Sequence, residues 1–152
     1  MEEINIRLAK SSDLTNIQDF QVKMEHTIEE HPSPDETGKA GVKHILENPD
    51  EGFYLVADFR DNIAGCLRIS FERSVSKNGY YWWIQNVFVE NEHRGKGIFK
   101  YLFDRVIDLA KEKGDVVSVK LHVHTNNPRA IKAYEKAGML RSPEYPYIFN
   151  IK

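Results

Sequence analysis

The chain has 152 residues, of which 41% are hydrophobic and 29% are charged, and its formal net charge is -2. A chain of this length can bury most of its apolar surface in one core, so we expect a single domain over residues 1–152. The near-neutral charge gives no reason to expect a nucleic-acid partner. Cys66 is the single cysteine, which excludes an internal disulfide and a cysteine-based zinc site. No apolar run is long enough to span a membrane, and the first residues lack the order of a signal peptide, so we expect a cytoplasmic protein.

Strand and helix patterns alternate along the first ninety or so residues. Apolar and polar residues alternate over 4–8, which predicts a strand, and apolar positions at helical spacing predict a helix over 14–28. The prolines within 31–34 break that helical pattern. One further helix and three strands are expected at 36–47, 53–59, 63–72 and 80–90.

The remaining residues predict two helices and two strands. A helical stripe begins at Ile98 and ends near Gly114, and a strand with one polar face follows over 117–124. Asn127 before Pro128 is a typical helix start, because asparagine caps the helix and proline fits its first turn. Aromatic and branched residues then alternate over 145–151, which predicts a closing strand. The order of elements indicates an α/β or α+β fold with a mixed sheet.

The segment HRGKGIFKYLF, residues 93–103, joins the end of a predicted strand to the start of a predicted helix. Such a turn suits a phosphate, because N–H groups at a helix start point outward and the helix dipole favours an anion. The P-loop pattern requires a wider spacing of glycines and a following Lys-Ser or Lys-Thr pair, which are absent here. The dinucleotide fingerprint also fails, because Lys100 stands where its third glycine belongs.

Two segments together resemble a known family. Val87-Phe88-Val89 followed by Arg94-Gly95-Lys96-Gly97-Ile98 resembles the Arg/Gln-x-x-Gly-x-Gly/Ala motif of the GCN5-related N-acetyltransferase (GNAT) superfamily. Residues 127–139, NPRAIKAYEKAGM, look like the superfamily's Asn-x-x-Ala-x-x-x-Tyr-x-x-x-Gly-Phe segment. The resemblance implies a mixed, mostly antiparallel central sheet of about six or seven strands, flanked by about four helices.

The resemblance implies transfer of an acetyl group from acetyl-CoA to a primary amine of a small molecule or a peptide. The residues it assigns to acetyl-CoA are Val87, Phe88 and Val89 along the pantetheine arm, Gly95, Lys96, Gly97, Ile98, Phe99 and Lys100 around the pyrophosphate, Arg94 beside the phosphates, and Asn127 on the other side of the arm. Phe99 departs from the motif, which has glycine or alanine there. Its N–H can still donate to a phosphate, but its ring must turn away from the phosphates.

Tyr134 matches the tyrosine to which the family assigns the role of general acid toward the departing thiolate. A free tyrosine with a pKa of ~10 is a weaker acid than a thiol at ~8.5, so full proton transfer would be uphill by roughly 2 kcal/mol. An oriented hydrogen bond from Tyr134 to the sulfur is therefore the larger part of the expected role.

The general base is open among three candidates. Many relatives carry a glutamate on the strand before the glycine loop, but the corresponding residue here is Gln85, which cannot accept a proton. His122 on the next predicted strand is our first choice, because imidazole titrates near neutral pH, and His124 or a water molecule are the alternatives. Because Gln85 lacks a carboxylate, a non-catalytic acyl-CoA-binding module is the alternative function.

Other readings predict no further site. His122 and His124 without a third ligand do not predict a metal site. Cys66 lies within a strand pattern, which favours a small buried residue over a nucleophile. The acceptor cannot be read from the sequence. The resemblance implies a homodimer, and the lack of a long apolar run predicts no membrane partner.

Overall fold

The computed structural model describes residues 3–28 and 35–152, so the predicted helix break at 31–34 lies outside the described residues. The chain forms two compact units, residues 1–122 and 123–152, and each is described by itself. The expectation of one domain over 1–152 stays a prediction.

The first unit is built on one sheet with the strand order β1-β2-β3-β4-β5. Its strands are β1 (Ile4–Leu8), β2 (Gly52–Phe59), β3 (Asn62–Ser74), β4 (Gly79–Val89) and β5 (Val116–Leu121). Neighbours pair antiparallel from β1 to β4, whereas β4 and β5 run parallel. The structure therefore confirms a mixed, mostly antiparallel sheet. The number of strands was wrong, since the described residues form five rather than six or seven.

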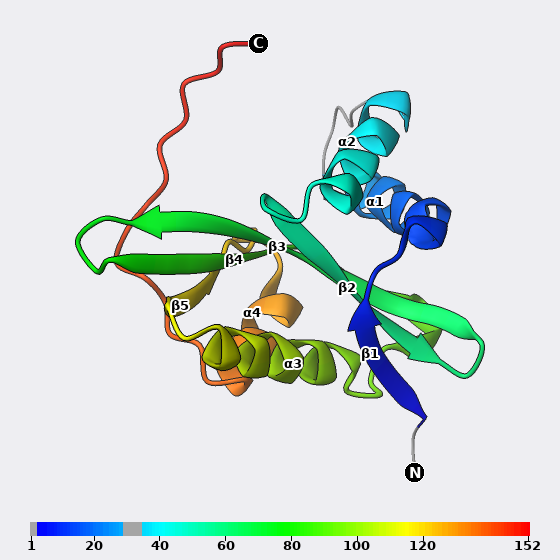
Figure 1. Ribbon diagram of the computed structural model, residues 1–152. Coiled ribbons are helices and arrows are strands. Elements are labelled where there is room, and N and C mark those ends of the chain that lie inside the picture. Colours follow the sequence, from blue (N-terminus) through cyan, green and yellow to red (C-terminus); the bar gives the residue numbers. More distant parts are fainter. Residues whose placement is uncertain (1–2, 29–34) are drawn as a thin grey trace. The chain divides into compact units, whose positions relative to one another are not determined.

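Helices cover both faces of this sheet. Figure 1 shows α1 (Leu14–Ile28) and α2 (Asp35–Glu47) on one face and α3 (Ile98–Lys113) on the other. Two short 3-10 helices, η1 (Ser11–Asp13) and η2 (Asn91–His93), precede α1 and α3. The predicted helical stripe is confirmed, because its apolar positions are the buried side of α3, at Ile98, Leu102, Phe103, Val106 and Ala110.

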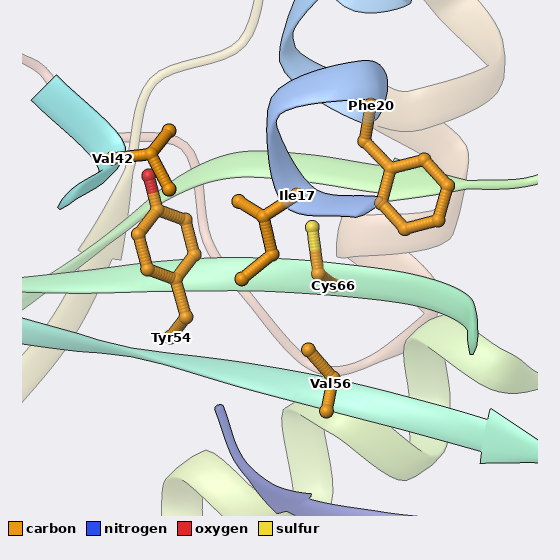
Figure 2. Packing of buried hydrophobic residues seen from close by; sticks show 6 residues of the cluster. All are labelled: Ile17, Phe20, Val42, Tyr54, Val56 and Cys66. Atoms are coloured by element: carbon orange, nitrogen blue, oxygen red, sulfur yellow. The ribbon is translucent and has the colours of Figure 1, made fainter. Parts of the chain in front are cut away.

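A hydrophobic cluster fills the space between the sheet and the first two helices. Figure 2 shows its buried members from α1, α2, β2 and β3, which are Ile17, Phe20, Val42, Tyr54, Val56 and Cys66. Burial raises the pKa of the Cys66 thiol to about 12. Cys66 is therefore a small core residue, as the sequence predicted, and its thiol stays protonated at neutral pH.

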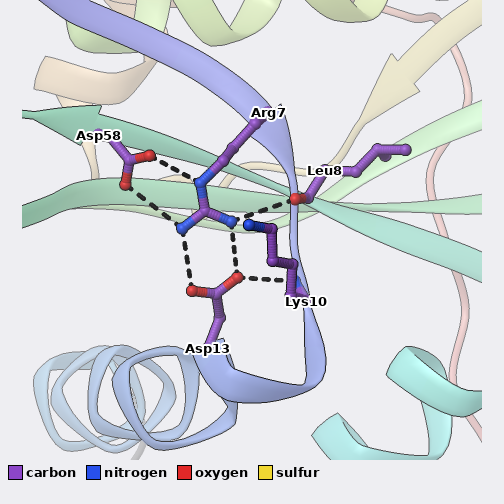
Figure 3. Close-up of polar contacts among 5 residues, drawn as sticks. All are labelled: Arg7, Leu8, Lys10, Asp13 and Asp58. Atoms are coloured by element: carbon purple, nitrogen blue, oxygen red, sulfur yellow. Dashed lines mark hydrogen bonds and ion pairs between the residues drawn. The ribbon is translucent and has the colours of Figure 1, made fainter.

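Arg7 ties the sheet to the start of α1 (Figure 3). Its Nε and Nη2 donate to the carboxylate of Asp58 at 2.6 and 3.4 Å, and its Nη1 and Nη2 donate to that of Asp13 at 2.8 and 3.0 Å. Asp13 also accepts from the backbone N–H of Lys10 at 2.7 Å. The hydrogen bonds from Arg7 hold the pKa of Asp13 below its usual range. This network joins β1, β2 and η1.

The second unit contains α4 (Pro128–Lys136), which ends before Gly138 at a φ of 98°. The described structure of residues 123–152 contains no strand, so the strand predicted over 117–124 ends at Leu121, and the closing strand predicted over 145–151 does not form. Tyr147 is 96% exposed and Phe149 is 89% exposed. Alternation of side chains gives a tendency to extend, but a strand forms only where its backbone pairs with a neighbour.

Candidate active site

The glycine loop lies between η2 and α3, where the sequence places it. Gly95 and Gly97 have φ values of 83° and 77°, in the left-handed region that L side chains rarely adopt. Gly97 is the N-cap of α3, and no described side chain caps this helix. The first turn of an α-helix has N–H groups without acceptors inside the helix. The loop therefore presents backbone donors and the positive end of a helix dipole.

The basic side chains around the loop are engaged with other groups. Lys100 pairs with both carboxylate oxygens of Asp104, at 2.7 and 2.8 Å. The Nε of Arg94 donates to the carbonyl oxygen of Val89 at 3.2 Å, and the Nζ of Lys96 lies 4.6 Å from the ring centroid of Phe59. All three cations are exposed. A phosphate at this loop would therefore compete with existing partners for their charges.

The ring of Phe99 packs along α3. Its centroid lies 5.8 Å from that of Phe103, one turn further into the helix. Phe99 is half-buried and Phe103 is buried. The side chain thus turns toward helix packing, which is the orientation that a phosphate at the helix start requires.

A β-bulge interrupts β4 just before the loop. In the pairing with β3, Arg68 lies opposite Gln85 and Cys66 lies opposite Phe88, so two residues of β4 face one residue of β3. Asn86 is the first of these two residues, and its φ of 54° is unusual for a residue other than glycine. The bulge therefore re-aims the strand at the point where it approaches the loop.

Beyond the bulge, one edge of β4 is open. The parallel pairing of β4 with β5 ends where Ile84 lies opposite Leu121, and β5 itself ends there. β4 continues to Val89, so its edge over 85–89 lacks a strand partner on the β5 side among the described residues. The backbone groups at this edge can bind the amides of an extended ligand, as an added strand would.

Four polar side chains form a network at the bulge. Arg68 donates through Nε to Oδ1 of Asn86 at 2.8 Å and through Nη2 to Oε1 of Gln85. The Nε2 of Gln85 donates to Oγ of Ser70 at 3.0 Å. Both ends of the Gln85 carboxamide are thereby fixed.

Aromatic rings and one histidine continue this face of the sheet. The ring of His122 stacks on that of Trp83, with centroids 4.5 Å apart. The Nζ of Lys120 lies 3.5 Å from the ring centroid of Tyr81, and the indole N–H of Trp83 donates to Glu72 at 2.7 Å. His122 is exposed, and no hydrogen bond joins its ring to another described residue. Its nitrogens are thus accessible for proton transfer.

The second unit carries the other residues predicted for the site. Asn127 caps α4, with its Oδ1 accepting from the N–H of Ala130 at 3.2 Å, so the helix start read from the sequence is confirmed. Tyr134 is half-buried, and burial raises the pKa of its hydroxyl. The Nδ1 of His124 accepts from the N–H of Asn126 at 3.3 Å, which leaves the proton of a neutral ring on Nε2.

Comparison with known proteins identifies the family. The acetyltransferase (GNAT) family matches residues 15–139. The chain belongs to the GNAT acetyltransferase family. A spermidine N(1)-acetyltransferase of Vibrio cholerae is 25% identical over 142 residues, which are 91% of this chain and 79% of that protein. A mycothiol acetyltransferase of Renibacterium salmoninarum is 28% identical over 114 residues, which are 73% of this chain but 33% of that protein.

Solved structures agree with the family match. The crystal structure of a possible acetyltransferase from Clostridium difficile 630 has a TM-score of 0.90 and 30% identity, and the match covers 98% of both chains. A predicted acetyltransferase from Clostridium acetobutylicum, solved with acetyl-CoA, has a TM-score of 0.79 and 21% identity, and the match covers 96% of both chains. The GNAT fold and the acetyltransferase class inferred from the two motifs are therefore confirmed.

The structure adds three residues of this GNAT chain that sequence reasoning missed, which are Arg68, Ser70 and Asn86. A lone charge within the apolar run from 63 to 69 was a signal for Arg68. Asparagine is the commonest residue after glycine at positive φ, but nothing in the sequence marks Asn86 as the bulge. In the part of the chain that the structure describes, no three His, Cys, Asp or Glu side chains group as a metal site. None of the helices within residues 3–28 and 35–152 is both long and apolar enough to cross a membrane.

Proposed function

We propose that this protein transfers an acetyl group directly from acetyl-CoA to a primary amine. One observation carries the proposal: the open edge of β4 over 85–89 leads into a loop with two left-handed glycines and an uncapped helix start. The first element suits the amides of a pantetheine arm, and the second suits a pyrophosphate. Acetyl-CoA carries both groups in this order.

In this proposal the chain binds acetyl-CoA mainly through its backbone. Val87, Phe88 and Val89 pair with the pantetheine arm, and residues 94–100 surround the pyrophosphate, with donors from the first turn of α3. Backbone donors suit these roles because they are fixed before the ligand arrives and depend little on the side chain. For this reason Phe99 is tolerated where relatives have a small residue. Asn127 is proposed to contact the arm in addition to capping α4.

The acceptor amine must be neutral to attack the thioester carbon. A lysine-like amine at neutral pH is almost entirely protonated, and losing that proton costs roughly 4.6 kcal/mol. His122 is our choice for the group that takes the proton, because its ring nitrogens are exposed beside the end of β5. His124 is the weaker candidate, since the lone pair of its Nδ1 already accepts from Asn126.

As the amine nitrogen bonds to the acetyl carbon, the carbon–sulfur bond breaks and its electron pair goes to the sulfur, while the nitrogen releases one proton to solvent, so that a neutral amide and a thiolate form. We propose that Tyr134 donates a hydrogen bond to this thiolate. Because burial raises the pKa of Tyr134, the hydroxyl stays protonated at neutral pH and is a poorer source of a transferred proton. The hydrogen bond, rather than complete proton transfer, is then its main contribution.

We also propose the class of acceptor, the location and the oligomeric state of the enzyme. The named relatives act on spermidine and mycothiol, and we extend to this chain an amine acceptor that is a small molecule or a peptide. A cytoplasmic location and a homodimer remain predictions.

The proposal is tested by calorimetry with acetyl-CoA, followed by release of free thiol in the presence of a panel of primary amines. We expect binding and amine-dependent release of CoA. Tyr134→Phe should lower kcat by about ten- to a hundredfold with little change in acetyl-CoA binding, because one donor to a developing charge is lost. An unchanged kcat would contradict the role of Tyr134. Binding without thiol release for any amine would favour the non-catalytic acyl-CoA-binding module.

A further inference from the structure

Arg68 uses one edge of its guanidinium fork and leaves the other open. Nε and Nη2 form the side edge, and they donate to Asn86 and Gln85. Nη1 and the second hydrogen of Nη2 form the end of the fork. No described residue accepts a hydrogen bond from Nη1. Because the side edge is held at two points, the open end is fixed in direction before any ligand arrives.

No carboxylate within residues 3–28 and 35–152 balances the charge of Arg68. Both of its acceptors are neutral amide oxygens, and no carboxylate among the described residues lies within 4.0 Å of it. Its positive charge acts on its surroundings, since it opposes the rise that burial causes in the pKa of Tyr54. A half-buried guanidinium without a counter-ion favours an anionic ligand.

The same face of the sheet carries a second cation in a similar state. Lys120 lies over the rings of Tyr81 and Trp83, and it too has no ion pair with a described carboxylate. Glu72, a carboxylate on this face of β3, accepts from the indole of Trp83. Arg68 and Lys120 thus lie on either side of β4, and neither forms an ion pair with a carboxylate of the described residues.

We infer that the acceptor amine carries a carboxylate and that Arg68 binds this group through the open end of its fork. The inference rests on the proposed function, because it names the class of amine that the same site accepts. A carboxylate matches the fork with two parallel hydrogen bonds, whereas an alkyl group makes none. A second ammonium group, as in a polyamine, is repelled by the unbalanced charge. A nearby guanidinium also disfavours the ammonium form of the bound amine, which aids its deprotonation.

A purely structural role is the main alternative. Arg68 joins Gln85 to Asn86, so it could simply hold the bulge in place. In that case its loss would affect every acceptor alike. Binding of a carboxylate instead predicts a change in the ratio between acceptors, which a bulge clamp does not produce.

The experiment compares matched amines on the full-length protein with acetyl-CoA, by release of free thiol. Glycine, β-alanine and γ-aminobutyrate are each set against the alkylamine and the diamine of the same chain length. We expect kcat/KM for at least one amino acid to exceed that of its alkylamine by about tenfold or more, and the diamine to be poorest. An equal or better rate with the alkylamines or diamines would overturn the inference while leaving the proposed function intact.

Arg68→Gln removes the charge and the fork, and it should bring the ratio of amino acid to alkylamine close to one. Arg68→Lys, which keeps the charge, should retain part of the preference. Arg105→Gln, on the exposed side of α3, is the matched control and should leave the ratio unchanged. A fall of the same factor for all amines in Arg68→Gln would assign Arg68 to the bulge alone and overturn the inference. Failure of the wild-type protein to bind acetyl-CoA would overturn the proposed function as well.

Discussion

Arg7 and Arg68 are two half-buried arginines on strands of one sheet, and they differ in what fills their guanidinium forks. In Arg7 the side edge holds Asp58 and the end of the fork holds Asp13, so one positive charge meets two carboxylates. In Arg68 two neutral amides fill the side edge and the end stays open among the described residues. The two guanidinium groups thus differ in what their surroundings leave open to a ligand.

The difference indicates which region is built for stability. The carboxylates around Arg7 belong to the chain itself, and they raise the pKa of its guanidinium above the usual value. A guanidinium that already binds two carboxylates of the fold has no free donors for a ligand. No carboxylate of the described residues matches the charge of Arg68 beside the open edge of β4, which adds little to stability and suits the proposed binding of an anion.

Replacing each arginine by methionine should give the largest difference in stability between the two sites. Arg7→Met leaves Asp13, whose side chain is 7% exposed, without its ionic partner, and should lower the free energy of unfolding by about 3 kcal/mol. Arg68→Met frees two neutral amides that water can reach, so its cost should be about 1 kcal/mol. Urea denaturation of both variants checks the pair. Equal losses would show that Arg68 is as structural as Arg7.

The pH dependence of stability should also differ between the sites of Arg7 and Arg68. The pKa of Asp13 is lowered in the folded protein, so its contribution is present above the unfolded value of ~3.9 and is lost as pH falls through the folded value. The stability difference between wild type and Asp13→Asn should therefore shrink as pH falls below about 4. Denaturation at several pH values measures it. Wild type and Arg68→Gln should show parallel curves over this range, because no carboxylate in the described part of the chain pairs with Arg68. Curves for Asp13→Asn that also stay parallel would contradict the role of the ion pair.

Local patterns of the sequence predicted much of this fold. The strand over 4–8 and the helix start at Asn127 follow from alternation and capping, which involve neighbouring residues alone. The turn at Gly95 and Gly97 also follows from the glycines themselves, and the structure shows that both are left-handed. These features need no knowledge of the partner strands.

The features that the sequence did not predict correctly depend on how strands pair with one another. The bulge at Asn86 is defined by a register in which residues of two strands, such as Arg68 and Gln85, lie opposite each other. No pattern within either strand contains that information. The alternation over 145–151 was wrongly predicted to form a strand, because alternating side chains indicate an extended backbone but do not show whether another strand pairs with it. The contact between Arg68 and Gln85 was missed because it follows from register rather than from composition.

The smallest expected effect is at Lys100, whose ion pair with Asp104 is as short as those of Arg7 but far more exposed. Its side chain is 63% exposed and that of Asp104 is 54% exposed, so Lys100→Met should cost at most about 0.5 kcal/mol of stability. If Lys100 turns to the pyrophosphate during binding, the Kd for acetyl-CoA should rise about two- to threefold in Lys100→Met. Asp104→Asn should lower that Kd, because it releases the ammonium group and removes a negative charge near the phosphates. Calorimetry at two salt concentrations measures both variants, and the effects should weaken at the higher concentration. Equal Kd values for both variants and the wild type would show that Lys100, like Arg7, pairs only within the protein and does not bind acetyl-CoA.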